Sequence, residues 1–208
     1  MGAGRIPSGA LVLCVTTALA VWGGGARAED DYLAHCVFYS DGRVARFDHM
    51  PITVRVGTVP AGADGRGYLD AVRRAAELWT EATDGLARFE FVSDRAAPEA
   101  VDIPVRWVTS LPGYVQERHL ARTTLIRPTR DEFRVRMDLG VVDRANGRLL
   151  TNEEMLTACL HELGHAIGLW GHSPIAADVM SPASAARAPT HRDVATLSRL
   201  YDLPLNTP

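Results

Sequence analysis

The chain carries, at residues 161–172, the stretch that decides its expected fold: His161-Glu162-Leu163-Gly164-His165-Ala166-Ile167-Gly168-Leu169-Trp170-Gly171-His172. On a helix, residues four apart share a face, so His161 and His165 are predicted to bind one zinc ion, with Glu162 beside a zinc-bound water molecule. A catalytic zinc takes three protein ligands and leaves one position open. Gly168 can end the helix and let the chain turn back, and we therefore expect His172 to be the third ligand.

Two capping signals place helices around and after this stretch. The segment Thr151-Asn152-Glu153-Glu154 has the Ser/Thr-x-x-Glu form of a capping box, which predicts that the zinc-site helix starts there and runs to about Leu169. A second such signal, Thr190-His191-Arg192-Asp193, predicts a terminal helix. The apolar positions of that helix form a buried face and are Val194, Leu197, Leu200 and Tyr201.

Upstream of the zinc-site helix, the pattern is that of strands with one further helix. Alternation of apolar and polar residues predicts a strand over 51–56. An apolar stripe predicts a core-facing helix from Tyr68 that ends before Gly85, with Trp79 as a packing residue. Further strands are predicted over 89–91, 101–107, 123–126 and 133–139. The order of elements favours a small α+β domain with helices packed on a twisted mixed sheet.

These residues resemble the zinc motif of the metzincins, and within them the matrixins, which is His-Glu-x-x-His-x-x-Gly-x-x-His followed by a methionine turn. His161, Glu162, His165 and Gly168 match in place, and residues 178–182, Asp-Val-Met-Ser-Pro, look like the methionine turn, with Met180 under the zinc. The similarity covers most of residues 45–203. It implies a zincin-like catalytic domain with an active-site helix and a C-terminal helix.

The chain departs from the matrixin motif by one residue, because the third histidine falls four places after Gly168 instead of three. Gly171 is the apparent insertion, and a glycine bulge there would restore the aim of His172. The step from His172 to Met180 equals that in matrixins, which favours a single insertion. Asp178 is the alternative third ligand, since carboxylates also bind zinc.

The resemblance implies a secreted zinc metalloendopeptidase that hydrolyses peptide bonds with Glu162 as general base. A protein or peptide substrate would lie extended along an edge strand, most plausibly residues 123–126, and residues 182–188 would form one wall of a specificity pocket. The alternative is a non-catalytic secreted zinc-binding or adhesion module with the metzincin fold. Glu162 argues against that alternative, because a structural zinc site needs no base. A zinc hydrolase with a downstream glutamate as third ligand is excluded, since no Glu follows His172.

The N-terminal residues have the form of a secretory signal peptide. Arg5 precedes an apolar stretch over about residues 10–22, and Ala26-Arg27-Ala28 fits a cleavage site before Glu29. The apolar stretch is shorter than the ~18 residues of a membrane span. We therefore expect a signal peptide over 1–28, an N-terminal arm over 29–45 and the peptidase domain over 46–208. The protein is expected to be secreted or periplasmic, without a membrane anchor, and monomeric.

Charge argues against a nucleic-acid partner. Removal of residues 1–28 leaves 20 basic residues against 25 acidic ones, a formal charge of −5 without any basic block. All 22 basic residues of the whole chain are arginine, which we interpret as the codon bias of a GC-rich bacterial genome.

The expected mature chain keeps Cys36 and Cys159. Because thiols are readily oxidised outside the cytoplasm, we expect a disulfide between them, which would tie the arm to the zinc-site helix. Two alternatives stay open. Cys36 could cap the zinc as a latency thiolate, or both thiols could be free and buried.

Other candidate metal ligands carry weaker patterns. Asp138 and Asp143 could hold calcium with backbone carbonyl groups, although two carboxylates at that spacing are weak support. The four remaining histidines have no partner at ligand spacing and are interpreted as surface or helix-start residues; they are His35, His49, His119 and His191.

Overall fold

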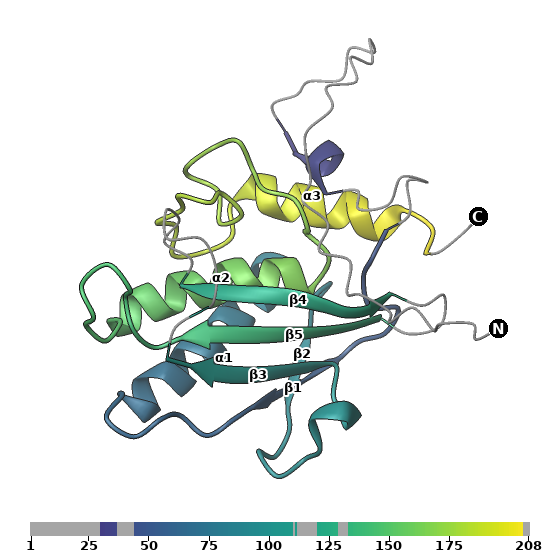
Figure 1. The fold of residues 1–208 in the computed structure, drawn as a ribbon. Coiled ribbons are helices and arrows are strands. Elements are labelled where there is room, and N and C mark those ends of the chain that lie inside the picture. Colours follow the sequence, from purple (N-terminus) through teal and green to yellow (C-terminus); the bar gives the residue numbers. More distant parts are fainter. Residues whose placement is uncertain (1–29, 37–43, 110, 112–119, 129–132, 206–208) are drawn as a thin grey trace, which may run out of the picture.

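The computed structural model describes residues 30–36, 44–109, 111, 120–128 and 133–205 (Figure 1). The predicted signal peptide lies outside these residues, and so does His119. In this part of the chain, none of the helices combines the length and the apolar character of a membrane span.

Five strands form one mixed sheet in the order β2-β1-β3-β5-β4. The strands are β1 (Ile52–Val56), β2 (Phe89–Phe91), β3 (Ile103–Val108), β4 (Ala121–Pro128) and β5 (Phe133–Gly140). β1 pairs in parallel with β2 and β3, and β3 pairs in parallel with β5. β4 pairs antiparallel to β5 and is the strand at one edge of the sheet. β4 is longer than the predicted 123–126 because it stays paired to β5, through a register shift between Leu125 and Arg127.

Helix α1 (Gly65–Ala82) buries the predicted stripe. It begins three residues before Tyr68, because the Asp64 side chain accepts a hydrogen bond from the Gly67 backbone and caps it. Trp79 is fully buried, and its indole N–H donates to the Leu160 carbonyl at 2.9 Å. Trp79 is thus the packing residue that the sequence predicts, and it joins α1 to the next helix.

Both predicted capping boxes are confirmed. Helix α2 (Asn152–Ala166) starts at Thr151, whose side chain accepts from the Glu154 backbone while the Glu154 side chain accepts from the Thr151 backbone. Thr190 and Asp193 cap helix α3 (His191–Asp202) in the same way. α2 ends at Ala166, earlier than the predicted Leu169, because Gly168 adopts a positive φ of 118° that an α-helix cannot contain.

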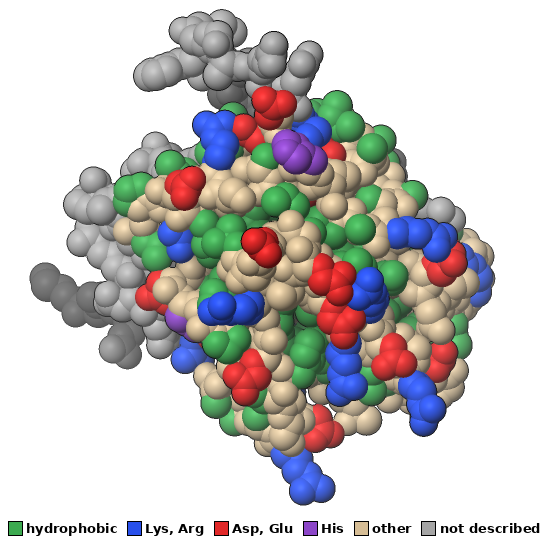
Figure 2. Space-filling model, turned by 180° about the vertical axis from the view of Figure 1, so that it is seen from behind, with side chains coloured by type: hydrophobic (Ala, Val, Ile, Leu, Met, Phe, Trp, Pro, Cys, Tyr) green, Lys and Arg blue, Asp and Glu red, His purple; other side chains and the backbone are tan. Residues whose placement is uncertain are grey.

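α1 and α2 lie side by side against one face of the sheet, and α3 lies beyond the β4 edge next to a short 3-10 helix, η1 (Leu33–His35) (Figure 1). The sheet contributes fully buried side chains to the core between these layers: Ile52, Val54, Ile103, Val105, Met137 and Leu139. The architecture is that of the predicted α+β class. On the face shown in Figure 2, arginine and acidic side chains are interspersed.

Candidate metal centre

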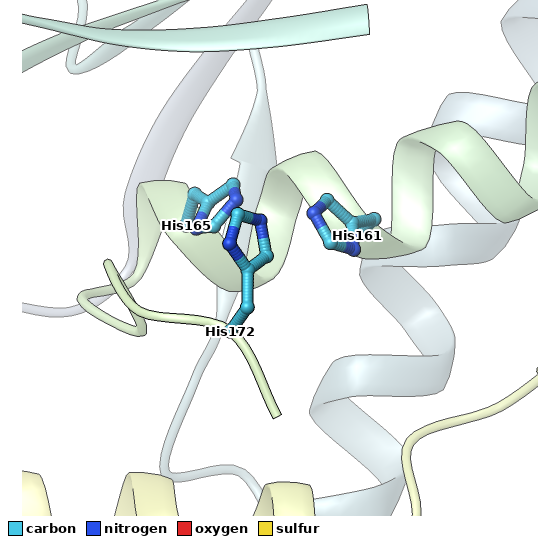
Figure 3. Close-up of side chains that lie close together, drawn as sticks. All are labelled: His161, His165 and His172. Atoms are coloured by element: carbon cyan, nitrogen blue, oxygen red, sulfur yellow. The ribbon is translucent and has the colours of Figure 1, made fainter. Parts of the chain in front are cut away.

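Three histidines converge where α2 ends (Figure 3). His161 and His165 lie one turn apart on α2, with ring centroids 4.7 Å apart. The chain reverses at Gly168 and brings His172 back, so that its ring centroid is 5.2 Å from that of His161 and 5.0 Å from that of His165. One ligand atom of each residue lies within 4.8 Å of those of the other two. The structure therefore brings together the three predicted ligands, including the one displaced by an extra residue.

Two backbone carbonyl groups orient the helical histidines. The Nδ1 atom of His161 lies 2.8 Å from the Val179 carbonyl oxygen, and that of His165 lies 2.6 Å from the Leu169 carbonyl oxygen. A carbonyl oxygen only accepts hydrogen bonds, so Nδ1 carries the proton in both rings. In the neutral form of each ring Nε2 is then the unprotonated atom, which is the atom that binds a metal.

The environment of His165 favours its neutral form. Burial lowers the pKa of His165 well below its usual value, and the neighbouring His161 and His172 lower this pKa further. Metal ligands must be deprotonated, so a neutral imidazole is the competent form. The donor set suits zinc, for which imidazole is a common ligand.

Glu162 is a buried carboxyl group beside this cluster, with a residue exposure of 6%. Its Oε2 atom is buried and has no hydrogen-bond partner within the described ranges. Burial raises the pKa of Glu162 to about 7, although hydrogen bonds from Thr123 lower it in part. The Thr123 hydroxyl also donates to the Glu162 backbone carbonyl at 2.9 Å. A carboxyl group with an unpaired buried oxygen and a pKa near neutrality can exchange a proton with a water molecule beside the three histidines.

Met180 is fully buried beneath the turn of α2 that carries His161 and His165. A Cβ atom on Gly164 would lie 2.2 Å from the Met180 sulfur and 3.0 Å from the Trp79 ring. Gly164 therefore allows α2 to approach Met180 closely. The sequence does not reveal this role, because Gly164 occupies a variable position of the predicted zinc motif.

The segment that contains Met180 is held by Asp193. Its fully buried carboxylate accepts hydrogen bonds from the backbone of Val179 at 2.9 Å and of Met180 at 3.3 Å. The sequence signals Asp193 only as a helix cap. In the structure it also fixes the Val179 peptide whose carbonyl orients His161.

Asp178, the alternative third ligand, is not part of the cluster. Its carboxylate accepts from the Thr190 hydroxyl at 2.7 Å, from the Arg192 guanidinium at 3.0 Å and from the Ser173 hydroxyl. Asp178 as the third ligand is therefore wrong for this structure, because its carboxylate accepts these three hydrogen bonds and connects the loop to α3.

The glycine-specific backbone angle expected at Gly171 is not found. Its φ does not lie in the positive region, so no glycine-specific backbone angle is needed there. A Cβ atom at this position would lie 1.6 Å from the His35 carbonyl oxygen and 3.0 Å from the Cys36 nitrogen. Glycine is required because the N-terminal segment crosses directly over it.

The predicted disulfide is not formed in the structure. Cys36 and Cys159 are both free and buried, which is the second of the two alternatives left open by the sequence. Cys159 is fully buried within α2, and its burial raises the pKa of the thiol. Burial raises the pKa of the Cys36 thiol to about 12, and the backbone of Gly171 hydrogen-bonds to it. A thiol in that environment stays protonated, which argues against the alternative of a latency thiolate.

The two aspartates considered as calcium ligands each accept hydrogen bonds from different protein groups. Asp138 accepts from Arg106 at 2.7 Å and from Arg136 at 3.1 Å. Asp143 accepts from the backbone of Ala145 at 2.9 Å within its own turn. Among the described residues, the three histidines are the potential metal ligands that lie close enough together to share an ion. His35, His49 and His191 are exposed, as predicted.

A cavity of about 740 Å³ opens beside His161, Glu162 and His172. Part of its wall comes from the loop after Met180, within the predicted range 182–188, and an ion pair between Arg187 and Glu153, 2.8 Å long, lies on its lining. The remaining lining residues are Leu120, Ala121, Glu154, Thr157, Ala158, Ser181, Pro182, Ser184 and Ala185. The candidate centre therefore opens onto a space large enough for a side chain of a ligand.

Comparison of this chain with protein-family models and with curated proteins finds no match. The chemistry that the centre can perform is therefore inferred from its own residues. They offer three imidazoles that converge on one point and, beside them, a carboxyl group with a pKa of about 7.

Proposed function

We propose that this chain is a zinc-dependent endopeptidase with a matrixin-like, metzincin-type catalytic domain. The observation that carries the proposal is the convergence of His161, His165 and His172 beside Glu162, whose buried Oε2 has no partner in the described part of the chain. Structural zinc sites usually fill all four positions with protein ligands, whereas catalytic sites use three. A three-histidine set next to an unsatisfied carboxylate fits the catalytic type.

Zinc, when bound, would polarise a water molecule and the carbonyl group of the scissile peptide bond. Glu162 takes a proton from the attacking water and passes it to the leaving amine. A pKa of about 7 suits both steps, because the group can accept and return a proton near neutral pH. Thr123 positions Glu162 from the neighbouring strand.

The fold supports a polypeptide as the substrate. β4 is an edge strand with β5 as its partner, and its residue Thr123 contacts Glu162 directly. An extended peptide that hydrogen-bonds along an edge strand is a common mode of recognition. A peptide on β4 would pass the proposed base, and one of its side chains would enter the cavity between α2 and the loop that contains Arg187.

The proposed architecture and location follow from the same features. The antiparallel edge strand beside α2, the buried Met180 and the closing helix α3 support the zincin-like form of the α+β domain. Secretion to the periplasm or the medium rests on the N-terminal signal over residues 1–28.

The test compares the purified mature protein with Glu162→Gln and with Glu77→Gln as a matched control on the exposed face of α1. We expect wild type and Glu77→Gln to hold near-stoichiometric zinc and to cleave an unstructured protein such as casein until a chelator is added. Glu162→Gln should retain zinc and lose cleavage by roughly 10²–10⁴-fold, the usual contribution of a general base.

Two results would contradict the proposal. Absence of zinc from the wild type would show that the three histidines do not form a zinc site. Zinc bound without cleavage of any member of a peptide library would favour the non-catalytic zinc-binding or adhesion module.

A further inference from the structure

The segment Asp31–Cys36 is packed into the body of the protein although it lies far from the metal centre in sequence. Its short helix η1 sits beside α3 (Figure 1). Tyr32 is 3% exposed and Cys36 is 2% exposed. The Tyr32 backbone N–H donates to the Thr196 hydroxyl at 3.0 Å, and Asp31 forms an ion pair with Arg199. Side-chain and backbone contacts thus fix this segment on α3.

A chain of hydrogen bonds runs from this segment to the first metal ligand. The Tyr32 hydroxyl donates to the Asp193 carboxylate at 2.6 Å. The other carboxylate oxygen accepts from the Val179 backbone at 2.9 Å, and the Val179 carbonyl accepts from His161 at 2.8 Å. Tyr32 is therefore three hydrogen bonds away from a ring whose direction decides metal binding. All three bonds are shielded from water or nearly so, which strengthens them.

A second contact reaches the third ligand. Gly171 immediately precedes His172 and is the extra residue in the motif. Its backbone hydrogen-bonds to the Cys36 thiol, and the His35 carbonyl lies so close that no side chain fits between them. The additional residue would lengthen the loop and give the His172 side chain more freedom of orientation. The segment above it removes that freedom.

We propose that Asp31–Cys36 is a positioning element of the metal centre, in which Tyr32 acts through Asp193 on His161, and the His35–Cys36 backbone and thiol act through Gly171 on His172. This inference rests on the proposed zinc site. It explains why the two positions that depart from expectation, the extra Gly171 and the unpaired Cys36, lie in contact with each other.

The experiment measures zinc affinity by competition with a chromogenic chelator, and the visible absorption spectrum of the cobalt-substituted protein. Tyr32→Phe removes one hydroxyl, and Tyr68→Phe is its control because that buried hydroxyl donates at 2.6 Å to the Leu150 carbonyl instead. Gly171→Ala introduces the forbidden Cβ, and Gly65→Ala is its control because the nearest atom there is 3.7 Å away.

We expect Tyr32→Phe to weaken zinc binding roughly tenfold, the lower end of the effect of residues that orient metal ligands, and Gly171→Ala to weaken it at least as much. Both should change the cobalt spectrum at saturating metal, because ligand geometry and not only stability is altered. Tyr68→Phe and Gly65→Ala should leave affinity and spectrum unchanged.

The inference is overturned if Tyr32→Phe folds, as judged by circular dichroism, and keeps the affinity and cobalt spectrum of the wild type. Should Gly171→Ala fail to fold, Tyr32→Phe and its control decide alone. A wild type that binds no zinc would overturn the proposed function itself. Unchanged variants of a zinc-binding wild type would overturn only the role of Asp31–Cys36.

Discussion

At the scale of single residues, the metal centre depends on groups that its motif does not contain. The carbonyl groups of Val179 and Leu169 set the direction of His161 and His165, and Thr123 reaches Glu162 from another element. The spacing of the histidines predicts which side chains meet, because a helix turn has a fixed geometry. It cannot predict which carbonyl fixes each ring, since that depends on the tertiary fold.

Thr123→Val tests the support given to Glu162. Hydrogen bonds from Thr123 lower the pKa of this carboxyl group, so loss of the hydroxyl should raise it. A base must be deprotonated to act, and the acid limb of the pH profile of kcat/KM should therefore move to higher pH. At pH 7 the rate should fall by roughly three- to tenfold, which corresponds to the net contribution of one typical hydrogen bond, about 0.5–1.5 kcal/mol.

Thr80→Val, in the last turn of α1, serves as the control for this substitution, because the Thr80 hydroxyl donates to the Ala76 carbonyl within the helix. A profile of Thr123→Val that coincides with those of wild type and control would show that Thr123 does not tune the base.

Gly164→Ala tests the close approach of α2 to Met180. The new methyl group would overlap the Met180 sulfur and press on the Trp79 ring, so both side chains would have to move. We expect the free energy of unfolding to fall by about 1–3 kcal/mol, the usual cost of overpacking a core. Urea denaturation measures it, and a variant as stable as the wild type would refute the contact.

At the scale of elements, the sequence predicts well those features that depend on residues close together in the chain. The starts of α2 and α3 follow from capping boxes, in which one short segment contains both partners. The start of α1 was placed too late because Asp64 caps it without that full signature. The sequence predicts too short a β4, because the length of this strand is determined by its pairing with β5 and not by its own pattern of apolar residues.

Thr151→Ala removes the cap that starts α2. The hydroxyl accepts from the Glu154 backbone at 3.2 Å, and alanine leaves this N–H without its partner. The free energy of unfolding should fall by about 1 kcal/mol. Thr80→Ala, inside α1, lacks a capping role and should cost less. Equal effects of the two substitutions in urea denaturation would contradict the role of the cap.

Glu154 gives the same helix start a pH dependence. Hydrogen bonds from Arg148 and from the Thr151 backbone lower the pKa of Glu154 from 4.5 to about 2. A lowered pKa stabilises the folded state above the unfolded value of 4.5, and the contribution disappears as the pH falls towards about 2. The difference in unfolding free energy between wild type and Glu154→Gln should therefore be constant above pH 5.5 or so and shrink towards pH 2. A difference that does not change with pH would show that the carboxylate is not involved.

At the scale of the whole molecule, α2 and the loop that follows it meet a distant N-terminal segment at the proposed metal centre. Helix α2 provides two of the proposed ligands and the proposed base, the loop after Gly168 provides the third proposed ligand, and the N-terminal segment covers that loop at Gly171. The first two were predicted from sequence because they lie within one motif. The covering segment was not, since neither Tyr32 nor Cys36 lies in a recognisable pattern. The same gap explains the wrong disulfide, which was expected from the oxidising compartment of a secreted protein and not from the geometry of the two cysteines.

Metal removal should therefore act on the entire fold. A bound ion would connect α2 to the loop that packs against Asp31–Cys36, and a ligand that binds only the folded state stabilises it. At a free zinc concentration of about 1,000 times the dissociation constant, the gain is ~4 kcal/mol. Thermal unfolding with and without a chelator should thus differ by several degrees, and readdition of zinc should reverse the change. Identical transitions would contradict a metal bound to the native state.

Zinc-edge X-ray absorption on the mature protein tests the central claim most directly, because it reports the atoms that surround the ion. The structure predicts three nitrogen neighbours at about 2.0–2.1 Å and one further light atom, which is the coordination of a catalytic site with an open position. A sulfur neighbour at about 2.3 Å, or four protein ligands without an exchangeable one, would contradict a catalytic three-histidine centre.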